Sequence, residues 1–118
     1  FLLEDVPFSD KPYIVSLLVH NGFIITSDAI NENCRRNNYY NVCKMLSFSN
    51  CVDELTLDAA ITSGNIRLVK KILSIDSPLI KENKIKGLYT AQKNHFIEIQ
   101  EFLHESIKDD IIKNFPTD

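Results

Sequence analysis

The chain has 118 residues, of which 44% are hydrophobic and 25% are charged, and its formal net charge is -3. This length and composition are typical of one ordinary globular domain that buries roughly two thirds of its unfolded surface, and not of a disordered chain. A pI near 5.6 gives no general attraction to phosphate, because binding to nucleic acid or an anionic membrane needs a concentrated basic surface. We therefore expect no nucleic acid partner and no membrane partner.

Cysteine use and hydropathy favour an intracellular protein. The cysteines Cys34, Cys43 and Cys51 are odd in number and lack the dense, even framework of a small secreted domain. No apolar run is long enough to span a bilayer, and the sequence does not open with a signal peptide pattern. We expect free thiols and a cytoplasmic or nuclear location. Because the sequence begins with Phe1, we also expect it to be part of a longer chain.

The first predicted element is a helix over residues 13–22. Ile14, Leu17 and Leu18 have the apolar spacing of a helix, and Gly22 is expected to end it, because glycine readily adopts a left-handed backbone. Residues 23–25 resemble a strand but are too short to predict one. The preceding segment FLLEDVPFS is expected to cover one end of the molecule.

Three stretches farther along the chain share one pattern, which is a short helix, an interruption and a second amphipathic helix. They are NCRRNNYYNVCKML at 33–46, AITSGNIRLVKKIL at 60–73 and TAQKNHFIEIQEFL at 90–103, and they align without a gap. The apolar columns agree: Cys34 with Ile61 and Ala91, Tyr39 with Ile66 and Phe96, Val42 with Val69 and Ile99, and Leu46 with Leu73 and Leu103. Each second helix is therefore predicted to bury one stripe.

The interruption in each stretch holds a residue type that accepts the left-handed backbone, namely Asn37, Gly64 and Asn94. The next column holds Asn38, Asn65 and His95, and asparagine is a good N-cap. We predict that the chain reverses at each of these three places. Ser27 and Asp53 are the predicted caps of the first helices.

Equivalent leucines lie roughly 28 residues apart, and a unit this short cannot bury its apolar face alone, so neighbouring units should stack in a line. The predicted fold is all-α, with residues 1–118 forming a single short helical-hairpin solenoid of about three and a half repeats. We expect the units at residues 10–25 (partial), 26–52, 53–80 and 81–106, followed by a capping helix at 107–115.

The small residue, the Gly-Asn or Asn-His turn and the following Val or Ile and Leu pair resemble the ankyrin repeat. The segments SGNIRLVKKIL and KNHFIEIQEFL carry this likeness, which covers roughly residues 10–106. The family's Thr-Pro-Leu-His opening is missing, with Asn31, Asp58 and Leu88 where its His would be. The period is also shorter than the family's ~33 residues, which implies trimmed or lost β-hairpin fingers. Another helical-hairpin solenoid remains the alternative, although tetratricopeptide units have a tryptophan pattern that this Trp-free chain lacks.

The resemblance implies a protein-binding scaffold or adaptor without catalytic activity. By analogy, the partner should contact the connectors and the outward residues of the first helices: Asn31, Glu32, Arg35, Arg36, Tyr40, Asp58, Thr62, Gln92 and Lys93. Arg35 and Arg36 beside Tyr40 rank first, because Arg and Tyr dominate interface hot spots. The alternative function is a structural or self-association segment of a larger repeat protein, which would make the chain a homo-oligomer.

An enzyme, a cofactor and a metal site are not expected. Cys43, His20, His95 and His104 are candidate catalytic groups, but the sequence has no phosphate-binding glycine loop, nucleophile elbow or His-Glu-x-x-His helix. His95 is explained by its turn column. Zinc ligation by the three cysteines and His20 lacks the close-spaced ligand pairs of structural zinc modules. Cys43 should be exposed, which leaves a reactive thiol there as a weaker hypothesis.

Overall fold

The computed structural model describes residues 9–114, and their regular structure is almost entirely helical. The helices are α1 (Pro12–His20), α2 (Ser27–Arg35), α3 (Tyr39–Phe48), α4 (Thr56–Thr62), α5 (Ile66–Leu73), α6 (Pro78–Lys81), α7 (Lys84–Lys93) and α8 (Ile97–Asn114). The predicted all-α class is confirmed. The short helix α6, which Ser77 caps by accepting from the amide of Leu79, was not predicted.

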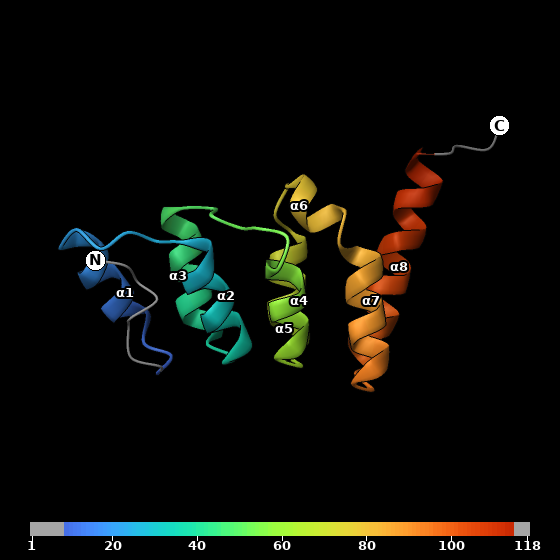
Figure 1. Cartoon of the computed structure of the whole chain (residues 1–118), viewed down its shortest axis with the longest axis horizontal. Helices are drawn as coiled ribbons and strands as arrows, with labels where there is room; N and C mark the ends of the chain where they lie inside the picture. The colour runs from blue at the N-terminus through green and yellow to red at the C-terminus, as the bar shows by residue number, and fades with distance from the viewer. Residues whose placement is uncertain (1–8, 115–118) are drawn as a thin grey trace.

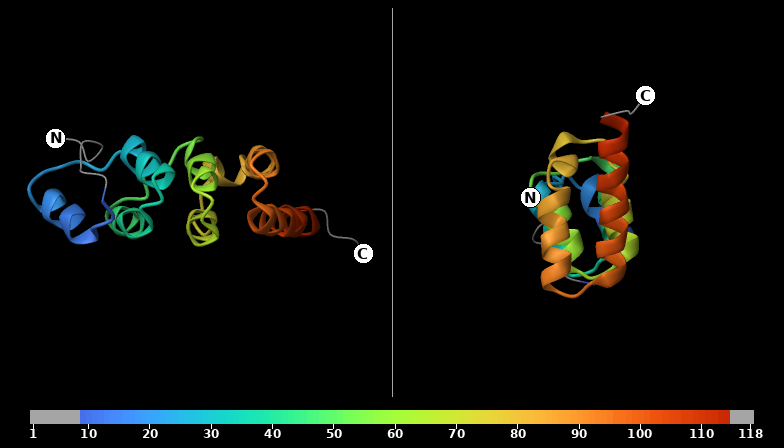
Figure 2. Two further views of the ribbon diagram at one scale, coloured as in Figure 1. Left: turned by 90° about the horizontal axis from the view of Figure 1, so that it is seen from below. Right: turned by 90° about the vertical axis from the view of Figure 1, so that its right-hand side faces the viewer.

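Most of these helices lie in two rows (Figures 1 and 2). The first row contains α2, α4 and α7, and the second row contains α1, α3, α5 and α8. Each of the hairpins α2–α3, α4–α5 and α7–α8 contributes one helix to each row, and neighbouring helices within a row are in contact. The hairpins follow one another along the long axis of a molecule that measures 54 × 29 × 18 Å.

Four helices end in the same left-handed cap. The residues with positive φ are Gly22 after α1 (90°), Asn37 after α2 (59°), Gly64 after α4 (73°) and His95 after α7 (59°). In each case the amide of this residue donates to the carbonyl three residues earlier, at 2.9 to 3.2 Å. After α1, α2 and α7 the next amide also reaches five residues back, which completes the hydrogen-bond pair of a Schellman cap. The reversals predicted at Asn37 and Gly64 are confirmed, as is the helix end at Gly22.

The third reversal lies one residue later than predicted. Asn94 has φ −95° and ends α7 as its C-cap, whereas His95 adopts the left-handed conformation. The amide and the side-chain Nδ2 of Asn94 both donate to the carbonyl of Thr90, at 3.1 and 2.9 Å. These bonds continue the helical direction for one more residue, so the gapless alignment misplaces this turn by one position.

Only one predicted N-cap of a second helix is confirmed. The Oδ1 atom of Asn65 accepts from the amide of Arg67 at 3.0 Å and caps α5. Asn38 stands at the N-cap position of α3, but its side chain makes no capping hydrogen bond there, and its Nδ2 donates to Oδ1 of Asn33 at 3.0 Å. Instead, the carboxylate of Asp10 accepts from two amides in the first turn of α3, at 2.7 and 3.2 Å. The segment before α1 thus supplies the cap that the sequence assigned to Asn38.

The predicted caps of the first helices are displaced along the chain. Thr26, not Ser27, caps α2 and accepts from the amide of Ala29 at 3.1 Å. Asp53 accepts from the amide of Leu55 at 2.9 Å, and α4 begins only at Thr56. Asp53 therefore shapes the turn before α4.

The core lies between the two rows and follows the predicted columns. Buried members are Cys34, Ile61, Ala91, Val42, Val69, Ile99, Leu46 and Leu103, and partly buried members are Tyr39, Ile66, Phe96 and Leu73. In α1 the predicted stripe is correct only in part: Ile14 and Leu18 pack against the core, but Leu17 is 61% exposed and the buried residue is Val15. Helix α1 packs against α3, so its contact side centres on Val15.

The two ends of the chain differ from expectation. Residues 107–114 continue α8 and do not form a separate capping helix. No glycine or proline stands between Leu103 and Ile107, so nothing breaks the helix there. The segment FLLEDVPFS, predicted to cover one end of the molecule, consists mainly of residues 1–8, which lie outside the described residues. Phe115, the last residue of the predicted capping helix, lies outside them too.

Candidate functional site

The turns of the three hairpins join into one continuous edge at the bottom of Figure 1, here called the turn edge (residues 35–40, 62–67 and 92–97). The Nδ2 atom of Asn65 donates to Oδ1 of Asn37 at 2.7 Å and ties the first turn to the second. The ring of Phe96 packs on Gly64, where a Cβ would lie 3.2 Å from a ring carbon. These contacts hold the three turns in fixed register.

A tyrosine–arginine patch, formed by Tyr39, Tyr40 and Arg67, lies on this edge. The Arg67 guanidinium is 4.4 Å from the centroid of the Tyr39 ring and 5.9 Å from that of Tyr40. The two tyrosine rings meet edge to face, with centroids 5.2 Å apart. Arg67 is exposed and Tyr40 is 53% exposed. Stacking on aromatic faces is a favoured arrangement of the planar guanidinium, so the patch positions a cation with unused donors at the surface.

Hydrogen bonding and charge shift two pKa values within this patch. Hydrogen bonding to Tyr40 is the main reason that the pKa of Arg67 is raised. A hydrogen bond with the Cys43 thiol and partial burial raise the pKa of Tyr39, and the neighbouring Arg67 charge opposes this rise. Near neutral pH the patch therefore combines the positive charge of Arg67 with the neutral phenol of Tyr39.

Arg35 and Arg36, the residues ranked first in the sequence, form a different arrangement on the same edge. Both pair with Glu32, at 3.2 and 2.8 Å, and the hydrogen bond from Arg36 is the main reason that the pKa of Glu32 is lowered. Of the three arginines in the chain, Arg67 is the one for which no ion pair is found within residues 9–114. Its charge is therefore the more available to a partner.

Two predicted surface residues instead connect neighbouring hairpins. Asn31 is only 1% exposed, and the expectation that it faces outward is wrong. Its Nδ2 donates to Asp53 at 2.9 Å, and its Oδ1 accepts from the hydroxyl of Thr56 at 2.7 Å. Asp58 is half-buried and accepts from the hydroxyl of Thr90 at 2.6 Å. Both residues point toward the next hairpin, where a bound protein cannot reach them easily.

Burial would raise the pKa of Asp53, but hydrogen bonds lower it below its ordinary value. The donors are the Asn31 side chain, the Leu55 amide and the hydroxyls of Ser27 and Thr56. A carboxylate that accepts several hydrogen bonds is stabilised in its charged form. Asp53 therefore belongs to the fold and not to the candidate site.

The other predicted contact residues are accessible. Thr62, Gln92 and Lys93 are exposed near the ends of α4 and α7, and Glu32 is half-buried. The Thr62 hydroxyl donates to the carbonyl of Asp58 in its own helix. Arg67 was not among the predicted contact residues, and Tyr39 was predicted only as a core residue. The repeat alignment could have indicated that Arg67 and Tyr40 lie close together, because they occupy equivalent positions in adjacent units.

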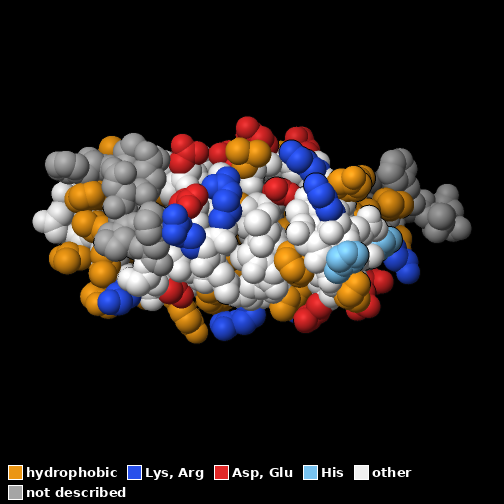
Figure 3. Space-filling model, turned by 60° about the horizontal axis from the view of Figure 1, so that its bottom comes forward, with side chains coloured by type: hydrophobic (Ala, Val, Ile, Leu, Met, Phe, Trp, Pro, Cys, Tyr) orange, Lys and Arg blue, Asp and Glu red, His pale blue; other side chains and the backbone are white. Residues whose placement is uncertain are grey.

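Charges on the turn edge are mixed. Figure 3 shows separate basic side chains with acidic ones close to them, and the pale blue histidines toward the C-terminal hairpin. This face presents no continuous basic field of the kind that phosphate backbones require.

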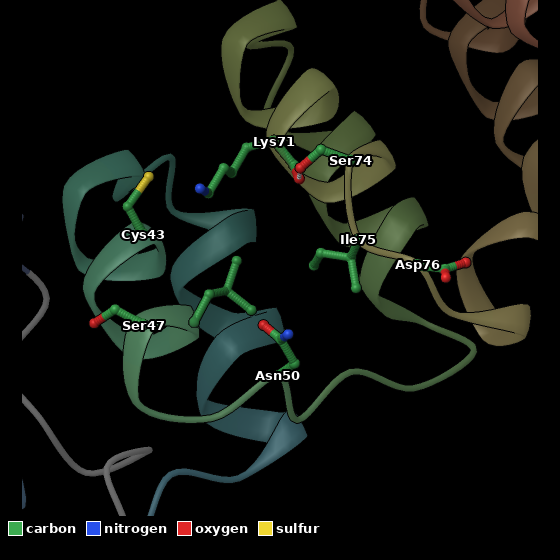
Figure 4. A pocket seen from close by; sticks show the side chains of 8 residues that line it. Cys43, Ser47, Asn50, Lys71, Ser74, Ile75 and Asp76 are labelled. Carbon is green, nitrogen blue, oxygen red and sulfur yellow. Dashed lines mark hydrogen bonds between the residues drawn. The ribbon is translucent and has the colours of Figure 1, made fainter.

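A groove of about 280 Å³ lies between α3 and α5 in the second row (Figure 4). Its lining consists of Cys43, Leu46, Ser47, Asn50, Lys71, Ser74, Ile75 and Asp76. Cys43 is half-buried, not exposed as predicted, and Figure 4 shows Lys71 on the facing helix. No histidine lines this groove, so the pairing of a thiol with an imidazole base that activates many catalytic cysteines is not present at Cys43.

Cys34 is buried, as predicted, and burial raises its pKa to about 12, which makes its thiol unreactive. Within the described residues no three His, Cys, Asp or Glu side chains are grouped so that they could hold a metal ion. The helices of this part of the chain are too short or too polar to cross a bilayer.

Comparisons with protein-family models, with curated protein sequences and with solved structures give no match. The turn edge and its tyrosine–arginine patch are therefore the features on which a functional conclusion must rest.

Proposed function

We propose that this chain is a protein interaction module, an ankyrin-like solenoid of about three and a half helical hairpins without catalytic activity. The hairpins are stacked in a line and each packs against its neighbours, which supports a repeat architecture. The shared left-handed turn supports it as well. In such arrays the stacked helices keep the fold, and exposed positions are free to specialise for a partner.

The observation that carries the proposal is the Arg67 guanidinium held over Tyr39 and Tyr40 without an ion pair in the described structure. Tyr and Arg supply much of the binding energy in protein interfaces. A side chain already held in one place loses less conformational entropy when a partner binds. The fork of Arg67 suits a carboxylate or a main-chain carbonyl of the partner.

The mixed charge of the turn edge also fits a protein partner. We place Arg35, Arg36 and Tyr40 at the contact, with Thr62 in the second hairpin and with Gln92 and Lys93 in the third. The proposal requires no cofactor and no metal. It places the chain inside the cell, where its three thiols remain reduced.

Affinity capture from a cell lysate tests this function. The immobilised wild-type chain should retain a distinct protein that the double variant Arg67→Glu/Tyr40→Ala does not retain. Arg35→Glu/Arg36→Glu should weaken capture less, because these arginines are partly neutralised by Glu32. The captured protein is then purified and titrated against each variant.

Lys108→Glu is the matched control, since it reverses an exposed charge on α8 away from the turn edge. Circular dichroism and thermal unfolding confirm that all variants are folded. A partner retained equally by the wild type and Arg67→Glu/Tyr40→Ala would contradict the assigned surface. A wild-type chain that captures nothing above bare resin would contradict the function.

A further inference from the structure

Each first-row helix has a side that points toward the next hairpin, here called its forward face. This face consists of the residues three, six and seven positions before the left-handed residue of the turn. In α2, which precedes Asn37, they are Cys34, Asn31 and Ile30. In α4, which precedes Gly64, they are Ile61, Asp58 and Leu57. All are buried except the half-buried Asp58. The next hairpin covers these faces, as the bonds from Thr56 to Asn31 and from Thr90 to Asp58 show.

In the last hairpin the same positions are uncovered. They hold Gln92, Tyr89 and Leu88 of α7; Gln92 is exposed, Leu88 is half-buried and Tyr89 is 68% exposed. One turn earlier, Ile85 is 71% exposed. Leu88 thus stands at the position of the buried Ile30 and Leu57. Tyr89 occupies the position of the polar Asn31 and Asp58, so this surface of α7 is apolar where α2 and α4 bond to the next hairpin.

The uncovered surface extends onto α8. A groove of about 210 Å³ lies between the two helices, with Ile85 on one side and Ile107 and Ile111 on the other. The Lys84–Asp110 ion pair, at 2.6 Å, joins the helices beside this groove. We call this surface the end face; its residues are Ile85, Leu88, Tyr89 and Gln92 of α7 and Ile107 and Ile111 of α8.

We propose that the end face binds a second copy of this chain, end face to end face. The two earlier forward faces indicate that the occupant of such a surface is a helical hairpin. Within the described residues α7–α8 is the hairpin whose forward face is uncovered. Two copies that bring these faces together each place the helical hairpin α7–α8 against the end face of the other. This isologous contact closes as a dimer and leaves neither end face free.

Charge favours one orientation of the two copies. Helix α7 carries Lys84, Lys86 and Lys93 and no acid, whereas α8 carries five acidic residues and two lysines. A two-fold axis parallel to the helices places α7 of one copy antiparallel to α8 of the other. The basic helix of each copy then lies beside the acidic helix of its partner, which lowers the electrostatic cost of association.

Sedimentation equilibrium of the full chain over a wide concentration range tests the dimer. The wild type should show a reversible monomer–dimer equilibrium. Ile85→Glu/Tyr89→Glu should weaken dimerisation at least tenfold, because each copy then brings two carboxylates into the contact. Ile111→Glu should also weaken it, since this residue contributes the α8 side of the groove.

Tyr13→Glu/Leu17→Glu is the matched control, because these residues form an exposed apolar pair of the same spacing on α1 at the other end of the molecule. It should leave the dimer intact. A wild type that remains monomeric at all concentrations would overturn the proposal, whatever the variants do. A dimer that survives Ile85→Glu/Tyr89→Glu, or that the control abolishes equally, would overturn it as well.

Discussion

The two rows of helices are held together by different means. In the first row the helices approach so closely that a Cβ on Gly87 of α7 would lie 2.5 Å from the Cδ1 atom of Ile61 in α4. In the second row longer side chains cross wider gaps: Arg67 reaches Tyr39, and Lys70 lies 5.2 Å from the Phe102 ring centroid. Grooves of about 280 and 230 Å³ open between α3 and α5 and between α5 and α8.

Side-chain size explains this difference. First-row helices contain small residues at buried positions, among them Ala29, Ala59, Ala60, Gly87 and Ala91. Small side chains permit close helix packing, so the first row contributes more of the close contact between hairpins. The second row and the turn edge contribute exposed aromatic and charged groups. We therefore expect substitutions in the close-packed first row to affect stability more than substitutions in the tyrosine–arginine patch, whose residues lie in the second row.

The largest effect is expected when the first row is forced apart. Gly87→Leu places a branched side chain against the fully buried side chains of Ile61 and Leu57. Overpacking of this kind costs about 2 to 3 kcal/mol. Chemical denaturation of the purified chain should show this loss of unfolding free energy.

Gly87→Ala is the matched control. The Cδ1 atom of Ile61 is the far end of a flexible side chain and can move aside, and alanine gains about 1 kcal/mol in helix propensity. We expect a much smaller net change than for leucine. If Gly87→Leu were as stable as the wild type, the close packing of the first row would be disproved.

The second-largest effect is expected at Asn31, the polar connection between α2 and α4. Asn31→Ala removes the donor to Asp53 and the acceptor of the Thr56 hydroxyl. Leaving buried polar groups without partners costs about 1 to 3 kcal/mol. Thr62→Ala is the control, because the Thr62 hydroxyl is exposed and bonds only within its own helix. Equal stability of the two variants in denaturant would show that the Asn31 network contributes little.

A third effect follows from the lowered pKa of Asp53. A carboxyl whose folded pKa lies below its unfolded value of about 3.9 stabilises the fold above pH ~4. This contribution is lost as the pH falls through the folded pKa. The melting temperature should therefore decrease between pH 5 and pH 3, and Asp53→Asn should reduce the slope of that decrease. An unchanged slope in the variant would exclude Asp53 as the group responsible.

The sequence predicted the elements that depend on local chemistry. Residues that tolerate a left-handed backbone marked Asn37 and Gly64 correctly, and the apolar columns identified buried residues such as Val69 and Leu103. It failed at Asn94 because the amide of this residue still donates to the carbonyl of Thr90 as in a helix, which places the left-handed residue at His95. It also failed at Asn38, because the cap of α3 comes from Asp10, which is distant in sequence.

The site was harder to predict than the fold because exposure depends on neighbouring units. Asn31 and Asp58 are polar, and each was predicted to face outward from its own helix. The next hairpin buries Asn31 and half-buries Asp58. Arg67 gains its position only from contact with Tyr39 and Tyr40 of the preceding hairpin. Single-unit patterns therefore identify the core better than the surface.

The smallest effect on stability is expected in the second row. Arg67→Ala removes an exposed cation from the Tyr39 and Tyr40 rings and should change the unfolding free energy less than Gly87→Leu or Asn31→Ala. It should nevertheless alter the titration of Tyr39, because the Arg67 charge opposes the rise in that residue's pKa. Ultraviolet absorbance should show part of the tyrosine ionisation moving to higher pH. Arg67→Lys keeps the charge and should restore most of the wild-type titration, and if both variants titrate alike, the charge of Arg67 does not act on the patch. A change in titration without a comparable loss of stability would separate the tyrosine–arginine patch from the row that holds the hairpins together.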